Sequence, residues 1–329
     1  MSDAQYFVTS TQSGTRTMDR SASNRREFLK ATTVAIAGGA SLNALVAHAL
    51  AAETTPLFKM SLGEWAFHRA LFDGTMKHFD VAKVTKEDCG IDAIEYSAQF
   101  FMDKSEDKEY LSELKRRAAD HGVKAVLITV DSQGNLGDPD AKQRLKAAQN
   151  HHKWVEAAKF LGCHSIRVNA ISDEKLSDDE QAKLVIDGLR PLVEFGGKRD
   201  INVIVENHGG LSSNGKWMVR VIQGIDLPSC GTLPDFGNFS SQPGKSYDRY
   251  LGVTEMMPFA KGVSAKSYAF DSHGNETTID YRKMLKIVLD SGYNGYLGIE
   301  YEGDKLSELD GVLATKKLLE TIRTELAAS

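Results

Sequence analysis

Short apolar runs alternate with longer amphipathic stretches along the chain from Pro56 onward. A short apolar run bounded by turn residues is typical of a buried strand, and a longer stretch with helical periodicity is typical of a crossover helix. The pattern predicts strands at 58–62, 93–96, 125–130, 165–168, 203–206, 231–233, 262–266 and 297–301. Predicted helices cover 81–89, 108–121, 140–162, 178–199, 214–224, 247–260, 280–291 and 304–326.

Eight strand–helix units in one stretch favour a single α/β domain over residues 56–329, a (β/α)8 TIM barrel with a closed parallel sheet. A doubly wound open sheet has the same alternation and is the structural alternative. The first strand-to-helix turn, residues 61–65, reads SLGEW and lacks the glycine-rich phosphate-binding pattern of such sheets. No long linker rich in Pro or Ser divides the segment, so we expect one domain.

Residues 1–51 are predicted to be a signal peptide. Residues 24–30 read NRREFLK and precede an alanine-rich, mildly apolar run at 31–50. The paired arginines resemble a twin-arginine export signal, although Asn24 stands where that pattern usually has Ser or Thr. Gly38 and Gly39 in the run argue against a permanent membrane helix. We therefore expect a periplasmic protein without stable membrane association, exported folded; an ordinary basic patch is the alternative.

Composition and charge narrow the classes of partner. The chain has 329 residues, of which 41% are hydrophobic, so it can bury a substantial core. Its 40 Lys and Arg residues are outnumbered by 45 Asp and Glu residues, which gives a net charge of −5. A polyanion gains little from such a surface, and nucleic acid is not expected as a partner. The sequence leaves a homo-oligomer open.

Cysteine usage indicates neither zinc nor a redox motif. Cys89, Cys163 and Cys230 are far apart and form no CxxC pair. Buried free thiols are the expected state. In an oxidising compartment, a disulfide between two of the three remains an alternative, and the sequence does not select the pair.

Acidic residues end several of the predicted strands. Glu95, Glu206, Asp235 and Glu300 all follow apolar runs, and a parallel barrel gathers such strand ends at one mouth. Neighbouring buried carboxylates repel one another and lose hydration, and a divalent cation offsets both costs. Oxygen donors favour Mg²⁺ or Mn²⁺, while Zn²⁺ or Co²⁺ is compatible with them. We expect Glu206, Asp235 and Glu300 to share one metal site, with Glu95 a substrate contact or a structural ion pair.

Other polar or aromatic residues near strand ends are candidates for substrate contacts. They are Trp65, His68, Asp131, Arg167, Asn169, His208 and Lys266. Of these, we predict that Trp65, His68, Asn169 and His208 bind substrate and that Lys266 is catalytic. An indole at a barrel rim can cover a sugar ring, but it packs against neighbours as often.

The strand-end motifs carry a resemblance to a known family. Residues 205–210 read VENHGG, 235–239 read DFGNF, 264–266 read SAK and 298–303 read GIEYEG. With these motifs the chain, from about residue 58 to about residue 319, resembles xylose-isomerase-like sugar isomerases and epimerases, a superfamily that includes endonuclease IV. The resemblance implies a divalent metal held by Glu, Asp, His and Glu at strands five to eight. Glu206, Asp235 and Glu300 match three of these ligands.

Two departures from the family pattern affect the implied metal. Ser264 stands where the family's His-x-Lys motif has its His, and Asn238 stands where many members have another His. A site without the imidazole should bind metal more weakly, unless His208 or a water replaces it. Lys266 could instead place its ammonium among the carboxylates, which leaves a site without metal as an alternative.

The chemistry implied by the resemblance is proton abstraction next to the carbonyl of a sugar or keto-sugar. Glu206 and Glu300 would be the acid/base pair, Asp235 a ligand, and the metal or Lys266 would stabilise an enediolate. Isomerisation and epimerisation differ only in where the proton returns. Loss of a β-substituent would instead make the enzyme a lyase on a keto-glycoside.

Two further classes compete with the sugar enzyme. One is a non-catalytic sugar-binding barrel, in which Ser264 in place of the family's His marks the loss of catalytic activity. Endonuclease-IV-like cleavage of DNA is disfavoured by the acidic charge, by the expected export and by Ser264 and Asn238 at positions where that enzyme has zinc-binding His.

Overall fold

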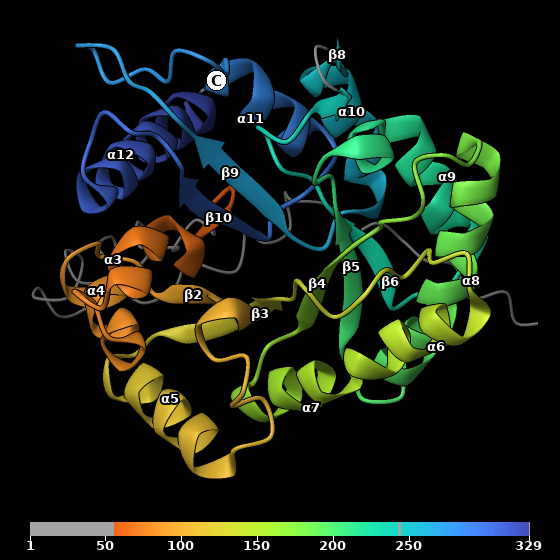
Figure 1. Ribbon diagram of the computed structural model, residues 1–329. Coiled ribbons are helices and arrows are strands. Elements are labelled where there is room, and N and C mark those ends of the chain that lie inside the picture. Colours follow the sequence, from red (N-terminus) through yellow and green to blue (C-terminus); the bar gives the residue numbers. More distant parts are fainter. Residues whose placement is uncertain (1–55, 243–244, 329) are drawn as a thin grey trace, which may run out of the picture. The chain divides into compact units, whose positions relative to one another are not determined.

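Eight parallel strands form the centre of the fold, which a computed structural model describes for residues 56–242 and 245–328 (Figure 1). The predicted signal peptide at 1–51 lies outside the described residues. The strands are β1 Lys59–Gly63, β2 Ala93–Ser97, β3 Lys124–Thr129, β4 Ser165–Asn169, β5 Asn202–Glu206, β6 Cys230–Leu233, β9 Val263–Ser267 and β10 Tyr296–Tyr301. Each of the eight predicted strands is confirmed to within about two residues.

The strand order is that of a barrel, β6-β5-β4-β3-β2-β1-β10-β9. All seven pairings in this order are parallel, and the first strand, β1, pairs with the last, β10. Isolated parallel bridges join Thr232 to Ala260 and Asp235 to Ser264, so the β6 and β9 ends of the sheet also meet. The predicted TIM-barrel fold is thereby confirmed.

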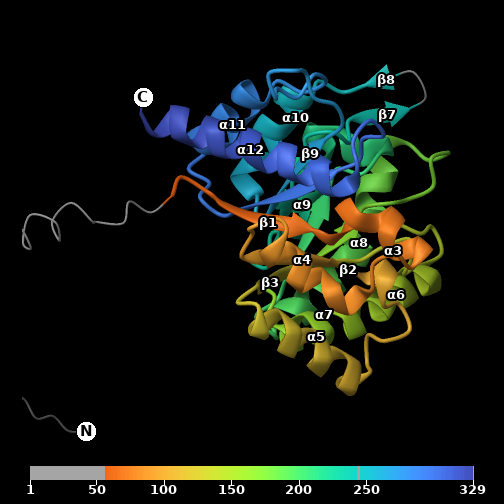
Figure 2. The same cartoon turned by 90° about the vertical axis from the view of Figure 1, so that its left-hand side faces the viewer.

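Helices surround the strands in both views (Figures 1 and 2). Their apolar faces pack on the sheet, as expected for crossover helices. They are α3 His68–Asp73, α4 Val81–Glu87, α5 Lys108–Asp120, α6 Ala141–Asn150, α7 His152–Leu161, α8 Asp178–Gly197, α9 Gly215–Ile225, α10 Arg249–Met256, α11 Tyr281–Asp290 and α12 Glu308–Ala327. Short 3-10 turns are η1 Glu64–Phe67, η2 His78–Asp80, η3 Ala98–Phe100, η4 Gly210–Ser213 and η5 Met257–Phe259.

The structure differs from the sequence prediction in four places, of which the first is the short helix α3, which was not predicted. The stretch predicted at 140–162 is two helices, α6 and α7, because the chain turns at His151. The stretch predicted as one helix at 247–260 is α10 followed by the 3-10 turn η5. Pro258 lies in η5, and its ring nitrogen has no hydrogen to donate to a continuing α-helix. A short antiparallel hairpin, β7 Ser240–Gln242 with β8 Lys245–Ser246, was not predicted.

Two apolar clusters lie on the two faces of the sheet. The large one joins the outward side chains of the strands to the surrounding helices and includes Trp154, Val205 and Met284. The small one comprises Ala93, Val126, Leu127, Ile204 and Leu233, with Tyr296 packed against them. Since successive strand residues face opposite sides, Glu95 and Glu206 continue the inward rows begun by Ala93 and Ile204. The small cluster, called the apolar plug below, therefore lies beneath the polar residues at the barrel mouth.

All three cysteines are buried and free, so the expected thiol state is confirmed. Across the described ranges 56–242 and 245–328, no helix has the length and hydropathy needed to cross a membrane.

Candidate functional site

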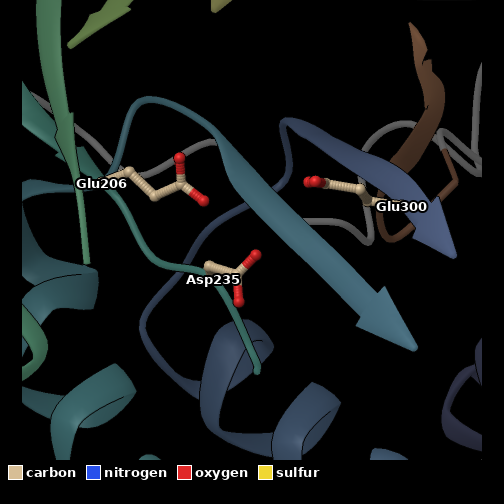
Figure 3. Close-up of side chains that lie close together, drawn as sticks. All are labelled: Glu206, Asp235 and Glu300. Carbon is tan, nitrogen blue, oxygen red and sulfur yellow. The ribbon is translucent and has the colours of Figure 1, made fainter. Parts of the chain in front are cut away.

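Three carboxylates meet at the barrel mouth. Glu206 ends β5, Asp235 follows β6, and Glu300 lies near the end of β10. One oxygen from each lies within 4.8 Å of the oxygens of the other two, and the side chains are directed toward a shared space (Figure 3). The structure therefore brings together the three residues predicted to bind metal.

Asp235 is held rigidly by its neighbours. Its Oδ1 accepts hydrogen bonds from the backbone N–H groups of Gly237 at 2.6 Å and Asn238 at 2.8 Å. The Asn207 side chain bonds both the N–H and the C=O of Asp235. The other oxygen, Oδ2, is buried and accepts no hydrogen bond from the described residues. A buried carboxylate oxygen in this state needs a cation to compensate it.

Lys266 supplies one such cation. Its side chain is only 2% exposed, and its Nζ lies 2.7 Å from Glu300, 3.2 Å from Glu302 and 3.6 Å from Asp235 Oδ2. Burial lowers the pKa of Lys266, but the surrounding carboxylates, led by Glu300, raise it by more, so the net shift is upward. Lys266 is therefore an ammonium ion bound to three acids.

Glu300 is engaged at both oxygens. Oε1 accepts from Lys266, and Oε2 accepts from the Ser264 hydroxyl at 3.0 Å. Burial raises the pKa of Glu300, but Lys266 lowers it by more, so Glu300 is held as a carboxylate. Ser264, at the position where the family pattern has His, thus contributes a hydrogen-bond donor to the cluster.

Glu206 is likewise engaged at both oxygens. Oε2 lies 2.7 Å from Arg167 Nε, and Oε1 accepts from Asn238 Nδ2 at 3.2 Å. Burial raises the pKa of Glu206 to about 8, against the opposing effect of Arg167. Arg167 also donates to Asp131 at 2.6 Å, and Asn169 donates to the same Asp131 oxygen.

The donor set fits a divalent cation. Glu206, Asp235 and Glu300 offer three hard oxygen ligands, and Asp235 Oδ2 is the atom without a hydrogen-bond partner among the described residues. With Glu95, Asp131 and Glu302 nearby, acids outnumber the two buried cations, Arg167 and Lys266. An all-oxygen set of this kind suits Mg²⁺ or Mn²⁺ best.

A cavity of about 580 Å³ opens beside the cluster. This volume is within the range of small-molecule sites. Glu206 and Glu300 line it, whereas Asp235 and Lys266 are buried and do not. A ligand in the cavity would therefore meet two of the three carboxylates directly.

Four of the predicted substrate contacts line this cavity: Trp65, Glu95, Asn169 and His208. His68 does not; its ring stacks on Trp65 with centroids 5.0 Å apart. Phe100 also stacks on the indole, and Trp65 Nε1 donates to Glu302 at 2.7 Å. These contacts fix the indole in place, in agreement with the packing alternative for that residue.

Some lining residues were not singled out from the sequence. Glu302 follows Glu300 by two residues in the GIEYEG motif, so the alternation of the strand could have indicated it. His151 reaches the cavity from the turn between α6 and α7. The uninterrupted helical pattern at 140–162 gave no signal for that turn.

Sequence comparisons agree with the fold. A family model described as a xylose isomerase-like TIM barrel matches residues 84–325. One segment is 32% identical over 80 residues to a C-glycoside deglycosidase alpha subunit from Arthrobacter globiformis, covering 24% of this chain and 19% of that protein. A protein of the same name from Microbacterium trichothecenolyticum is 37% identical over 46 residues, or 14% of this chain and 12% of its own. The alignments thus span less than a fifth of these relatives.

Solved structures share the barrel at low identity. The 3-keto-D-glucoside 4-epimerase from E. coli superposes with a TM-score of 0.61 at 19% identity, over 81% of this chain and 99% of its own. A D-tagatose 3-epimerase-like protein gives 0.62 at 15% identity, over 82% and 99%. IolI, with a bound zinc atom, gives 0.63 at 14% identity over the same shares. At these identities the likeness establishes the fold alone.

Proposed function

We propose an activity for this chain on the premise that it belongs to the xylose isomerase-like TIM barrel family, whose model matches residues 84–325. The proposed reaction is isomerisation or epimerisation of a sugar or keto-sugar through an enediolate. One observation carries the proposal: three carboxylates have oxygens within 4.8 Å of one another, and two of them, Glu206 and Glu300, line a cavity of about 580 Å³. Groups that exchange protons with carbon must be held beside the bound substrate, which the two cavity-lining carboxylates are placed to do.

Two carboxylates line the cavity and are the proposed acid/base pair. Glu206 is fixed by Arg167 and Asn238, and Glu300 by Lys266 and Ser264. One takes the proton from the carbon next to the carbonyl, and the other returns a proton to the neighbouring carbon or to the opposite face. The ammonium of Lys266 stabilises the negative charge that these steps bring into the site.

Glu206, Asp235 and Glu300 would hold a divalent metal, with Mn²⁺ or Mg²⁺ favoured. A metal bound there would supply Lewis-acid stabilisation of an enolate oxygen. Because Ser264 offers a hydroxyl in place of an imidazole, we expect weaker binding than a four-ligand site gives. Elemental analysis of the purified protein tests this, and less than one divalent ion per chain would leave Lys266 as the central cation.

A second candidate is a lyase on a keto-glycoside. The segments similar to C-glycoside deglycosidase alpha subunits favour it, although they cover less than a fifth of those proteins. The first step is the same proton abstraction, and the electron pair then expels the substituent at the β-carbon. Release of a free aglycone would identify the lyase, whereas an isomeric sugar would identify the isomerase or epimerase.

The deciding experiment is solvent deuterium incorporation. D-fructose, D-tagatose and a methyl 3-keto-glucoside are incubated with the protein and Mn²⁺ in heavy water, and deuterium at carbon is measured by NMR. We expect incorporation with at least one probe, and its loss in both Glu206→Gln and Glu300→Gln with unchanged circular dichroism. Glu109→Gln, on an exposed helix position, is the matched control.

Two outcomes would contradict the proposal. Deuterium incorporation at a near-wild-type rate by either Glu206→Gln or Glu300→Gln would contradict the acid/base assignment. Binding of a probe by calorimetry with no incorporation or product would favour the non-catalytic sugar-binding barrel.

We also propose that the enzyme acts in the periplasm on a small neutral sugar. The NRREFLK segment supports export, and replacing Arg25 and Arg26 with Lys should retain the protein in the cytoplasm. Unchanged fractionation of that double variant would contradict twin-arginine export.

A further inference from the structure

Glu95 is a buried acid on the floor of the cavity. It lies in β2, two residues after Ala93 of the apolar plug, and its inward side chain is 5% exposed. It lines the cavity together with Glu206 and Glu300. Burying an acid at the boundary between the apolar plug and the polar mouth costs hydration free energy, so its presence there needs a structural or functional explanation.

The depth of Glu95 follows from its contact with β10. A Cβ placed on Gly298 would lie 2.6 Å from both Glu95 carboxylate oxygens, so the carboxyl group occupies the space left by that glycine. Gly298 precedes Glu300 by two residues on the same inward row, a rise of about 6.6 Å along a strand. Glu95 therefore lies one layer below the attachment point of Glu300.

Glu95 is the least engaged of the cavity acids. Ser61 donates a hydrogen bond to Oε1 at 2.6 Å. Within 56–242 and 245–328, no Lys, Arg or His forms an ion pair with Glu95, and Oε2 accepts no hydrogen bond. Glu206 and Glu300, by contrast, have both oxygens engaged by an ion pair or a hydrogen bond from the protein. Glu95 thus keeps one oxygen available to a ligand.

The electrostatic surroundings favour a carboxyl that can carry a proton. Burial raises the pKa of Glu95 to about 7; Glu300 adds to the rise, while the Ser61 hydrogen bond and Arg167 oppose it. Cys163 and Tyr293 also lie near it, and burial raises the pKa of both. A general acid is most effective when its pKa is close to the working pH.

We propose that Glu95 is a further catalytic residue, which exchanges a proton with the carbonyl oxygen of the substrate while a mouth carboxylate exchanges the proton on carbon. This inference rests on the proposed enolisation. As the C–H bond breaks, its electron pair forms the C=C bond, and the carbonyl π pair takes the proton of Glu95 as a new O–H bond. Glu95 thereby converts the enediolate of the proposed reaction into a neutral enediol, which leaves Glu95 as a carboxylate and the proton from carbon on the mouth carboxylate. The reverse transfer restores both groups.

Three variants test the role of Glu95. Glu95→Gln keeps the shape of the side chain and removes the acidic proton. Glu95→Asp keeps the carboxyl group but draws it back by one methylene. Gly298→Ala adds a methyl group in the space that the Glu95 carboxyl group occupies. The heavy-water assay is run with D-fructose, D-tagatose and the methyl 3-keto-glucoside, with Glu109→Gln as the control. We expect Glu95→Gln to lower kcat by roughly 10²–10⁴-fold with KM changed less than about 3-fold. Glu95→Asp should recover part of the loss, and Gly298→Ala should fall between wild type and Glu95→Gln.

The outcomes separate this inference from the proposed function. Incorporation by wild type and by Glu95→Gln at rates within about 3-fold of each other would overturn the role of Glu95 and leave the enolisation intact. A rise in KM with unchanged kcat would also overturn it, since that is the signature of a binding contact. Incorporation by neither protein would overturn the proposed function, and the role of Glu95 with it. If Glu95→Gln fails to fold, the rate of Gly298→Ala decides.

Discussion

Replacing Lys266 with Met removes the cation at the centre of the acidic cluster while keeping a long unbranched side chain. Lys266 Nζ lies 2.7 Å from Glu300, 3.2 Å from Glu302 and 3.6 Å from Asp235. Lys266→Met leaves these acids in place without their compensating charge. We therefore expect the variant to be less stable and its stability to depend on added metal.

The size of the effect follows from the burial of the partners. Removing one member of a buried ion pair costs about 3–5 kcal/mol. Glu300 and Glu302 keep 17% and 29% of their side-chain exposure, so water reaches them and the lower end of that range applies. A loss of about 3 kcal/mol corresponds to a fall in Tm of about 6–12 °C for a domain of this size.

The sign of the pH dependence is fixed by the same charges. Without Lys266, the clustered acids have higher pKa values folded than unfolded, so the folded state binds more protons. Unfolding free energy then falls as pH rises, and the defect of the variant grows from pH 5 to pH 8. Added Mn²⁺ should restore part of the stability, because the ion binds only the folded cluster.

Urea denaturation followed by circular dichroism, in EDTA and then in Mn²⁺, measures these effects. Lys286→Met is the matched control, since Lys286 pairs with Asp290 on an exposed helix face and such pairs contribute little. A Lys266→Met protein as stable as wild type in EDTA at pH 7 would refute the electrostatic reasoning. So would a defect that shrinks as pH rises.

Three further expectations concern the thiols, the substrate charge and the metal. Burial raises the pKa of Cys89 and Cys230 to about 12 and also raises that of Cys163. We therefore expect iodoacetamide at pH 8 to label no thiol in the folded protein and three thiols in urea. A single labelled thiol in urea would reveal a disulfide. Arg167 is the sole Lys or Arg among the described residues that line the cavity, and it is already ion-paired. We therefore expect kcat/KM for a neutral sugar to exceed that for its phosphate by at least about tenfold. Equal values for the two substrates would contradict this. Asp235→Asn should weaken Mn²⁺ binding by at least about tenfold in calorimetry, and unchanged affinity would remove Asp235 from the ligand set.

The periodicity of the chain was sufficient to predict the barrel. Strands of a parallel barrel are buried on both faces, so they stand out as apolar runs between amphipathic helices. The same pattern did not reveal the turn at His151, because apolar positions continue at helical spacing through 140–162. It also gave no signal for the β7–β8 hairpin, which is held by backbone pairing between polar residues.

The sequence by itself determined that Glu206, Asp235 and Glu300 end neighbouring strands, since strand order in a barrel follows chain order and places those ends together. Only the tertiary structure decided how their charges are compensated. Which oxygen faces Lys266, Arg167 or Ser264, and which faces the cavity, depends on distances of a few ångströms between residues far apart in the chain. The free oxygen of Glu95 is a feature of the same kind. Its carboxyl group occupies space left by the missing side chain of Gly298, and Gly298 lies just over 200 residues further along the chain.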